Sequence, residues 1–107
     1  MHTTVMEFDG QLRLLSTAEG GRHGPIAALV YRPRLRLGDV GWEGRVEELE
    51  QELLKPGEEG RCKLSLILLQ DNARLIQPGT TLELLEGSKI VGTCTIRSAG
   101  RAWAPTA

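Results

Sequence analysis

Hydrophobic and polar residues alternate with a period of two in several short segments of this chain. The clearest of these segments are 34–37, 63–68, 81–84 and 90–97. Successive side chains of a β-strand point to opposite faces, so this alternation indicates strands with one buried face and one exposed face. The hydrophobic pattern therefore predicts a fold that is built mainly from short strands.

Turn-forming residues recur between these segments at short intervals. The turn signals are Asp9-Gly10, Glu19-Gly20-Gly21, Gly38-Asp39, Pro56-Gly57, Asp71-Asn72, Pro78-Gly79, Glu86-Gly87-Ser88 and Gly92. Frequent turns between short strands predict an all-β sandwich or barrel rather than alternating strands and helices. We expect strands at residues 4–8, 11–16, 26–37 (bent at Pro33), 44–50, 60–69, 80–86 and 89–98.

The segment 45–55 fits this scheme least well. Its apolar residues recur at helical spacing (Val46, Leu49, Leu53 and Leu54), and nearly all of its other residues favour helices. Taken alone, the segment would be a helix. A strand requires cross-strand pairing to override this preference, as happens in many sheets. The local pattern leaves both interpretations open.

The length and composition are those of one globular domain. The chain has 107 residues, of which 40% are hydrophobic and 25% charged. We expect a single domain at residues 1–98 and a loosely ordered tail at 99–107. Only 4% of the residues are aromatic, which argues against a stacking platform for single-stranded nucleic acid. No run approaches the ~20 apolar residues of a membrane helix. With no visible secretory signal, a cytoplasmic protein is expected, in which Cys62 and Cys94 are free, buried thiols.

Charge is nearly balanced overall but unevenly distributed. The net charge is −1, which disfavours binding to nucleic acid through bulk charge. Residues 11–39 contain five arginines against one glutamate and one aspartate, whereas residues 43–59 contain seven glutamates against one arginine and one lysine. This polarity could steer a partner or could reflect two solvated faces.

Several motifs, taken together, resemble a known family. Glu19-Gly20-Gly21-Arg22-His23-Gly24-Pro25 is followed by Tyr31-Arg32-Pro33, and three further segments follow in order: Asp39-Val40 with Gly44, Pro56-Gly57-Glu58 with 62–66, and 84–92. This succession resembles the C-terminal (third) domain of elongation factor Tu across residues 5–98, as a stand-alone domain. At three places the family's residues are replaced here by Gly24, Arg34 and Thr93-Cys94.

The resemblance implies a closed or nearly closed antiparallel six-stranded barrel, with a strand at 44–50. It also implies a translation-associated module that contacts tRNA or another structured RNA. The chain contains no Gly-x-x-x-x-Gly-Lys-Ser/Thr loop, so neither GTPase activity nor a nucleotide cofactor is expected. The alternative function is a protein-binding or self-associating module, which uses the surface that the parent factor's other domains would cover.

Candidate binding residues cluster in the basic half and in the last hairpin. For contact with RNA or a partner they are Arg22, His23, Arg32, Arg34, Arg36, Gly87 and Lys89. The three arginines of 32–36 alternate and so share one strand face, where they suit phosphate or an acidic partner. Arg22 and His23 could instead brace their turn, and the arginine row could instead pair with the glutamate-rich stretch. Trp42, placed in a loop, would be an interface anchor if exposed.

Catalysis has little support in the sequence. The chain has two histidines, His2 and His23, and two cysteines at unrelated spacings, which do not form a zinc-binding set. We therefore expect no catalytic residue, no metal and no cofactor, and a protein that is not an enzyme. The partners expected are an RNA, another protein or a second copy of the chain, and no membrane.

Overall fold

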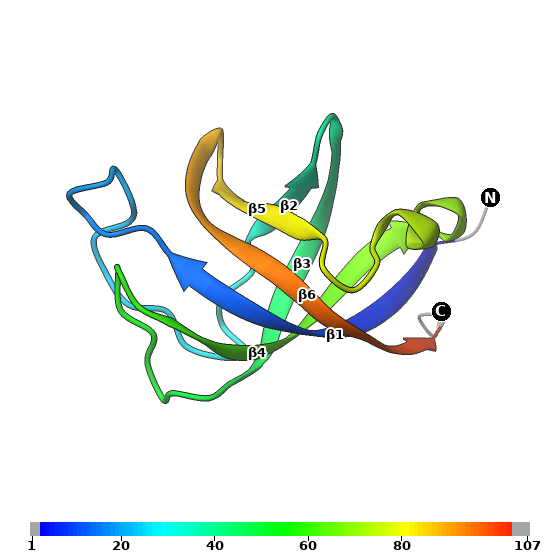
Figure 1. Ribbon diagram of the computed structural model, residues 1–107, viewed down its shortest axis with the longest axis horizontal. Coiled ribbons are helices and arrows are strands. Elements are labelled where there is room, and N and C mark those ends of the chain that lie inside the picture. Colours follow the sequence, from blue (N-terminus) through cyan, green and yellow to red (C-terminus); the bar gives the residue numbers. More distant parts are fainter. Residues whose placement is uncertain (1–2, 104–107) are drawn as a thin grey trace.

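The computed structural model describes residues 3–103, and the side chains of all of these except Gln70 and 99–103. These described residues form six strands and one short 3-10 helix (Figure 1). In order they are β1 (Thr3–Leu14), β2 (Arg34–Leu37), β3 (Val40–Leu49), β4 (Glu59–Leu69), η1 (Gln70–Leu75), β5 (Thr81–Glu86) and β6 (Lys89–Trp103). The predicted all-β class is confirmed.

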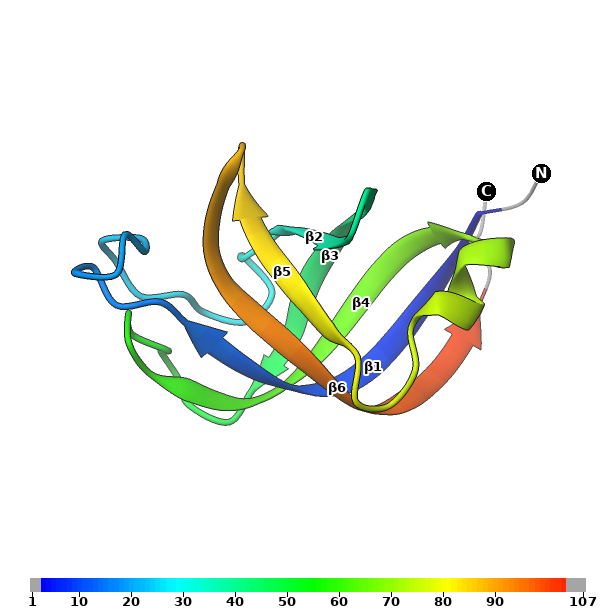
Figure 2. The same cartoon turned by 45° about the horizontal axis from the view of Figure 1, so that its top comes forward.

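The six strands close into an antiparallel barrel with the order β1-β4-β3-β2-β5-β6. β1 closes the barrel because it pairs with β4 along one edge and with β6 along the other. The long strands are strongly bent, and η1 lies beside the end of β4 and the start of β1 (Figure 2). Closure removes the free strand edges that an open sheet of this size would expose.

Leucine fills most of the barrel interior. Alternate residues of β4 point inward, and Leu64, Leu66 and Leu68 are at most 2% exposed. From β1, Phe8 and Leu12 reach the same core and are fully buried. The period-two pattern of the sequence therefore marks the inward face correctly, because a closed barrel has one apolar side per strand.

The strand at 44–50 is confirmed, and the helix that its local pattern favours is wrong. Residues 44–49 belong to β3, which starts earlier, at Val40, and ends at Leu49, one residue before the predicted end. On one side this segment pairs with β4, and on the other Gly44 and Val46 form backbone hydrogen bonds with residues 29–33, which precede β2. This pairing satisfies backbone groups of the segment on both edges and outweighs its intrinsic preference for helix.

Five other predictions of local structure are wrong. No turn occurs at Asp9-Gly10 or at Gly92, because β1 and β6 continue through these positions. Of the predicted strand 26–37 only Arg34–Leu37 is strand. The turn signal at Asp71-Asn72 lies within η1. Residues 99–103, expected in a loose tail, belong to β6 and pair with β1, while 104–107 lie outside the described residues.

The two cysteines are free and buried, as expected. They lie on β4 and β6, the two strands that flank β1, and their Sγ atoms are 3.8 Å apart. Gly10 of β1 lies between them: a Cβ atom there would be 2.7 Å from the Cys94 Sγ atom. Gly10 therefore provides space for a side chain from the neighbouring strand and does not form a turn.

Candidate binding groove

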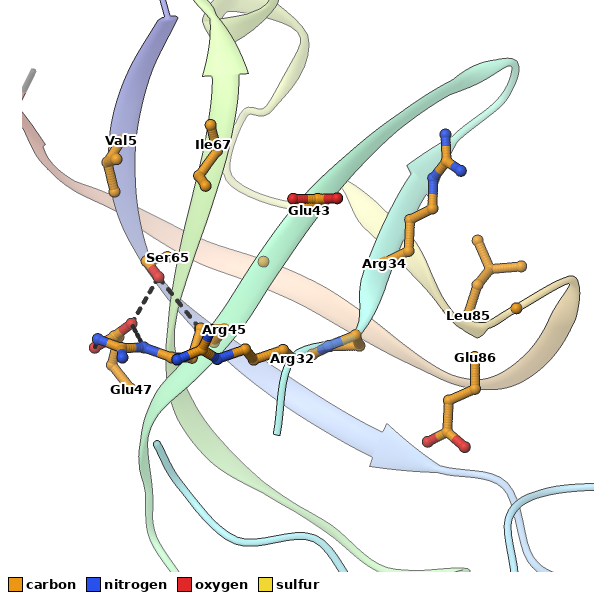
Figure 3. Close-up of a pocket in the computed structure, with 13 residues that line it drawn as sticks. Val5, Arg32, Arg34, Glu43, Arg45, Glu47, Ser65, Ile67, Leu85 and Glu86 are labelled. Carbon is orange, nitrogen blue, oxygen red and sulfur yellow. Dashed lines mark hydrogen bonds and ion pairs between the residues drawn. The ribbon is translucent and has the colours of Figure 1, made fainter. Parts of the chain in front are cut away.

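A groove of about 810 Å³ crosses the outer face of the barrel between β1 and the β5–β6 hairpin (Figure 3). Strand register explains how distant residues meet there: Val5, Ile67, Glu43, Arg34 and Leu85 are successive cross-strand partners on β1, β4, β3, β2 and β5. The groove therefore has an apolar floor with charged walls. Its charged residues are Arg32, Arg34, Arg45, Glu43, Glu47 and Glu86.

Two arginines of the groove have no ion pair in the described part of the chain: Arg32, just before β2, and Arg34, the first residue of β2. Both are exposed. The guanidinium of Arg34 lies over Gly41, where a Cβ atom would be 2.9 Å from Nε and 3.1 Å from Nη2, and it points away from the other charged groups of the groove (Figure 3). Arg34 is therefore held in place by packing while its charge stays available.

A cluster of Arg45, Glu47 and Ser65 forms one wall of the groove. Arg45 donates from Nε and Nη2 to the two carboxylate oxygens of Glu47, at 2.7 and 2.8 Å, and Ser65 donates to the same carboxylate at 2.7 Å. The hydrogen bonds from Arg45 hold the pKa of Glu47 below its ordinary value despite partial burial, and the charge of Arg32 acts in the same direction. Glu47 is therefore an ionised, fully engaged carboxylate.

Glu86 forms the other end of the groove, where it links three parts of the chain. Its carboxylate accepts hydrogen bonds from Arg22 at 2.7 Å and from the hydroxyl of Tyr31 at 2.6 Å, and the guanidinium of Arg22 lies 5.2 Å from the centre of the Tyr31 ring. Arg22 also donates to the backbone oxygens of Gly24 and Pro25. The glycine-rich loop is thus attached to the β5–β6 hairpin.

The same network sets the protonation of both acidic groups. Burial by itself raises the pKa of Glu86, but the hydrogen bonds from Tyr31 and Arg22 outweigh it and lower the pKa. Burial, reinforced by the adjacent carboxylate, raises the pKa of Tyr31. The tyrosine therefore stays a hydrogen-bond donor and the glutamate stays an acceptor at neutral pH.

The other predicted site residues divide into engaged and free groups. Arg36 pairs with Glu83 of β5 at 2.8 Å, not with the glutamate-rich stretch, and Lys89 donates to the backbone oxygen of Gly21 at 3.1 Å. Gly87 adopts a φ of 63° in the hairpin turn and borders the groove. His23 is exposed and has no partner among the described side chains. Of the seven predicted residues, Arg32, Arg34 and Gly87 line the groove, whereas the other four lie outside it.

Trp42 does not meet the condition for an interface anchor. Its side chain is 5% exposed and belongs to the core, because Trp42 lies in β3 and points inward rather than lying in a loop. Its indole N–H has no hydrogen-bond partner within the described residues. The prediction failed because the turn at Gly38-Asp39 is followed by a strand from Val40 onward.

Sequence reasoning missed the apolar floor and the acidic residues of the groove: Val5, Ile67, Leu85, Glu43, Glu47 and Glu86. The exposed position of Ile67 follows from the alternation of β4, so a partial signal existed. The sequence gives no signal for the pairing of strands that are distant along the chain, and the apolar floor exists only because of that pairing. Leu85 in particular is outward-facing in register with Arg34, yet 4% exposed.

Comparison with models of known protein families finds no match. The only helix in the described part, η1, is too short to cross a membrane. The described residues also contain no group of three or more histidine, cysteine, aspartate or glutamate side chains that could hold a metal ion.

The network around Glu86 predicts a pH dependence of stability. Because the pKa of Glu86 is lower in the folded state than in the unfolded chain, its contribution is complete above the ordinary value of 4.5 and is lost as the pH falls through the folded-state pKa. Glu86→Gln should therefore be less stable than the wild type at neutral pH, and this difference should shrink in acid. Denaturant unfolding at several values between about pH 3 and pH 7 measures this difference in the free energy of unfolding.

Glu52→Gln, which removes a carboxylate at an exposed position, is the control for the loss of one negative charge. A difference between Glu86→Gln and the wild type that stays constant with pH would contradict the prediction.

Proposed function

We propose that this chain is a non-catalytic binding module, a barrel of the elongation factor Tu C-terminal domain type, which binds a protein partner in the groove. The observation that carries the proposal is that Arg32 and Arg34 border the groove without an ion pair among the described residues. Arg22 and Arg36 are engaged inside the molecule. The unpaired arginines therefore offer positive charge to a partner, and they outnumber Glu43, the one glutamate of the groove without an ion pair in the described part of the chain.

The mixed character of the groove favours protein over RNA as the partner. An RNA backbone would run a continuous row of phosphates past the exposed Glu43, and it would gain little from the apolar surface of Ile67, which is 50% exposed. A protein surface offers carboxylates and apolar side chains together. Arginine beside apolar surface is also characteristic of energetically important positions in protein interfaces.

The experiment is affinity capture from native lysate with immobilised wild-type protein and with Arg34→Glu, each with and without ribonuclease. We expect a protein that survives ribonuclease treatment and is lost with Arg34→Glu, because the substitution places like charge against the partner's carboxylate. Arg97→Glu is the matched control, since Arg97 is an exposed arginine of β6 outside the groove. Equal capture by wild type and Arg34→Glu would refute the proposal.

RNA binding is the second candidate, and one observation favours it. His23 lies exposed and unpartnered, within the described residues, in the glycine-rich loop, where the resemblance implies contact with the RNA backbone. Titration of the protein with total tRNA tests this function directly. It predicts binding that weakens steeply with salt, because each neutralised phosphate releases counterions, and that decreases with His23→Ala. No binding at low salt would exclude it.

A further inference from the structure

The chain segment that leads into β2 pairs with β3 along only one of its edges. The amides of Val46 and Gly44 donate to the carbonyl oxygens of Tyr31 and Pro33, at 3.0 and 3.1 Å. The backbone groups of Val30 and Arg32 alternate along the chain with those of Tyr31 and Pro33, and none of them has a hydrogen-bond partner among the described residues. Residues 30–32 therefore present an open edge, defined here as the N–H and C=O groups of Val30 and Arg32.

β5 does not cover this edge, because it ends too early. β2 pairs with β5 as far as Arg34, whose cross-strand partner is Leu85. Two residues earlier, Arg32 would face Gly87, but β5 ends at Glu86 and Gly87 belongs to the turn of the hairpin. The row of hydrogen bonds between β2 and β5 thus stops where the open edge begins. Arg32 of the open edge lines the groove, and Val30 lies just beyond its end.

The side chains beside the open edge are unusual for a surface loop. Leu29 adopts a φ of 72°, the left-handed region that costs a residue other than glycine about 1–2 kcal/mol. Leu29 and Val30 are 57% and 78% exposed. A strained residue that holds two apolar side chains in solvent next to unpaired backbone groups is typical of a surface that is covered in a complex.

From these observations we infer that the partner of the groove is bound by strand addition: an extended, acidic segment of a protein pairs with the open edge. Its backbone bonds to Val30 and Arg32, an apolar side chain contacts Val30, and a carboxylate meets Arg34. The acidic character follows from the charged groove residues that have no ion pair in the described part of the chain, because these are two arginines, Arg32 and Arg34, against one glutamate, Glu43. This inference rests on the proposed function and specifies the partner's conformation and charge.

A displayed library of random linear peptides is the probe. Selection on the wild-type protein should enrich peptides that are rich in aspartate, glutamate and β-branched residues and poor in proline. Their binding should protect the amides of Val30 and Arg32 from hydrogen exchange. Enrichment of basic, proline-rich or helical peptides, protection elsewhere, or no enrichment would each overturn the inference.

Variants of one selected peptide separate backbone pairing from charge. N-methylation at the alternate positions that face the edge should weaken binding about ten-fold or more, because each lost donor leaves a carbonyl unpaired. N-methylation at the intervening positions is the matched control and should have little effect. Arg34→Ala should weaken binding by about ten-fold while Arg97→Ala leaves it unchanged, with circular dichroism confirming that both variants are folded. Equal effects of the two methylation patterns would refute strand addition.

The two proposals fail in different ways. If lysate capture depends on Arg34 but no acidic extended peptide is selected, the groove binds a folded protein surface and only the strand-addition inference fails. If capture is indifferent to Arg34, the proposed function itself fails. If the groove is instead occupied by a second copy of the chain, light scattering should show a dimer that acidic peptides do not dissociate. That result would also overturn the inference.

Discussion

Phe8→Ala should lower the free energy of unfolding by about 3–5 kcal/mol, the usual range for emptying a buried phenylalanine site. Phe8 is fully buried and is the only phenylalanine in the chain. It lies on β1, the strand that closes the barrel, where it is the cross-strand partner of Leu64 on β4. A closed barrel cannot collapse easily around a cavity, because every strand is fixed by two neighbours.

Denaturant unfolding followed by circular dichroism measures this effect. Domains of this kind are stable by about 5–15 kcal/mol, so the loss removes a large share of the total. Phe8→Leu, which keeps most of the volume, should cost clearly less and remains measurable if Phe8→Ala is largely unfolded. Ile67→Ala is the surface control, since Ile67 is 50% exposed. A loss below about 1 kcal/mol for Phe8→Ala would mean that the barrel interior is not packed as described.

Gly10→Ala should lower the free energy of unfolding by about 1–3 kcal/mol, the range for overpacking a core. The new Cβ atom would lie 2.7 Å from the Cys94 Sγ atom and 3.0 Å from the backbone oxygen of Thr95. Gly10 is not one of the glycines with a positive φ in the described part of the chain. The cost would therefore come from lack of space and not from backbone strain.

A double-mutant cycle identifies the cause. Adding Cys94→Ala to Gly10→Ala removes the sulfur atom and should recover part of the stability, whereas the contact with the backbone of Thr95 remains. Gly24→Ala is the matched control, because the nearest atom to its Cβ position is 4.0 Å away. If the effects of Gly10→Ala and Cys94→Ala are simply additive, the close contact between these two positions is not the reason for the glycine.

The sequence alone determined the strands whose pattern is complete within a few residues. In β4, β5 and the middle of β6 the alternation of apolar and polar positions correctly marks which side chains face the core, whereas at the start of β6 Val91 is buried and Ile90 is exposed. The turn glycines at 38, 57, 79 and 87 were also visible, and each adopts a positive φ. These features are local: side-chain period and backbone sterics act between neighbours in the chain, so they need no knowledge of the fold.

Only the tertiary structure decided which charged groups are free and where they meet. Arg22, Arg34 and Arg36 look alike in the sequence, but the register of β2 and β5 places Arg36 opposite Glu83 and Arg34 opposite Leu85. The glycine-rich loop brings Arg22 to Glu86. The sequence predicted a turn at Gly10, but Gly10 lies within β1 and leaves room for the side chain of Cys94 on β6. The groove and the open edge arise in the same way, because cross-strand register joins residues that are far apart in the sequence, and no local pattern encodes that register.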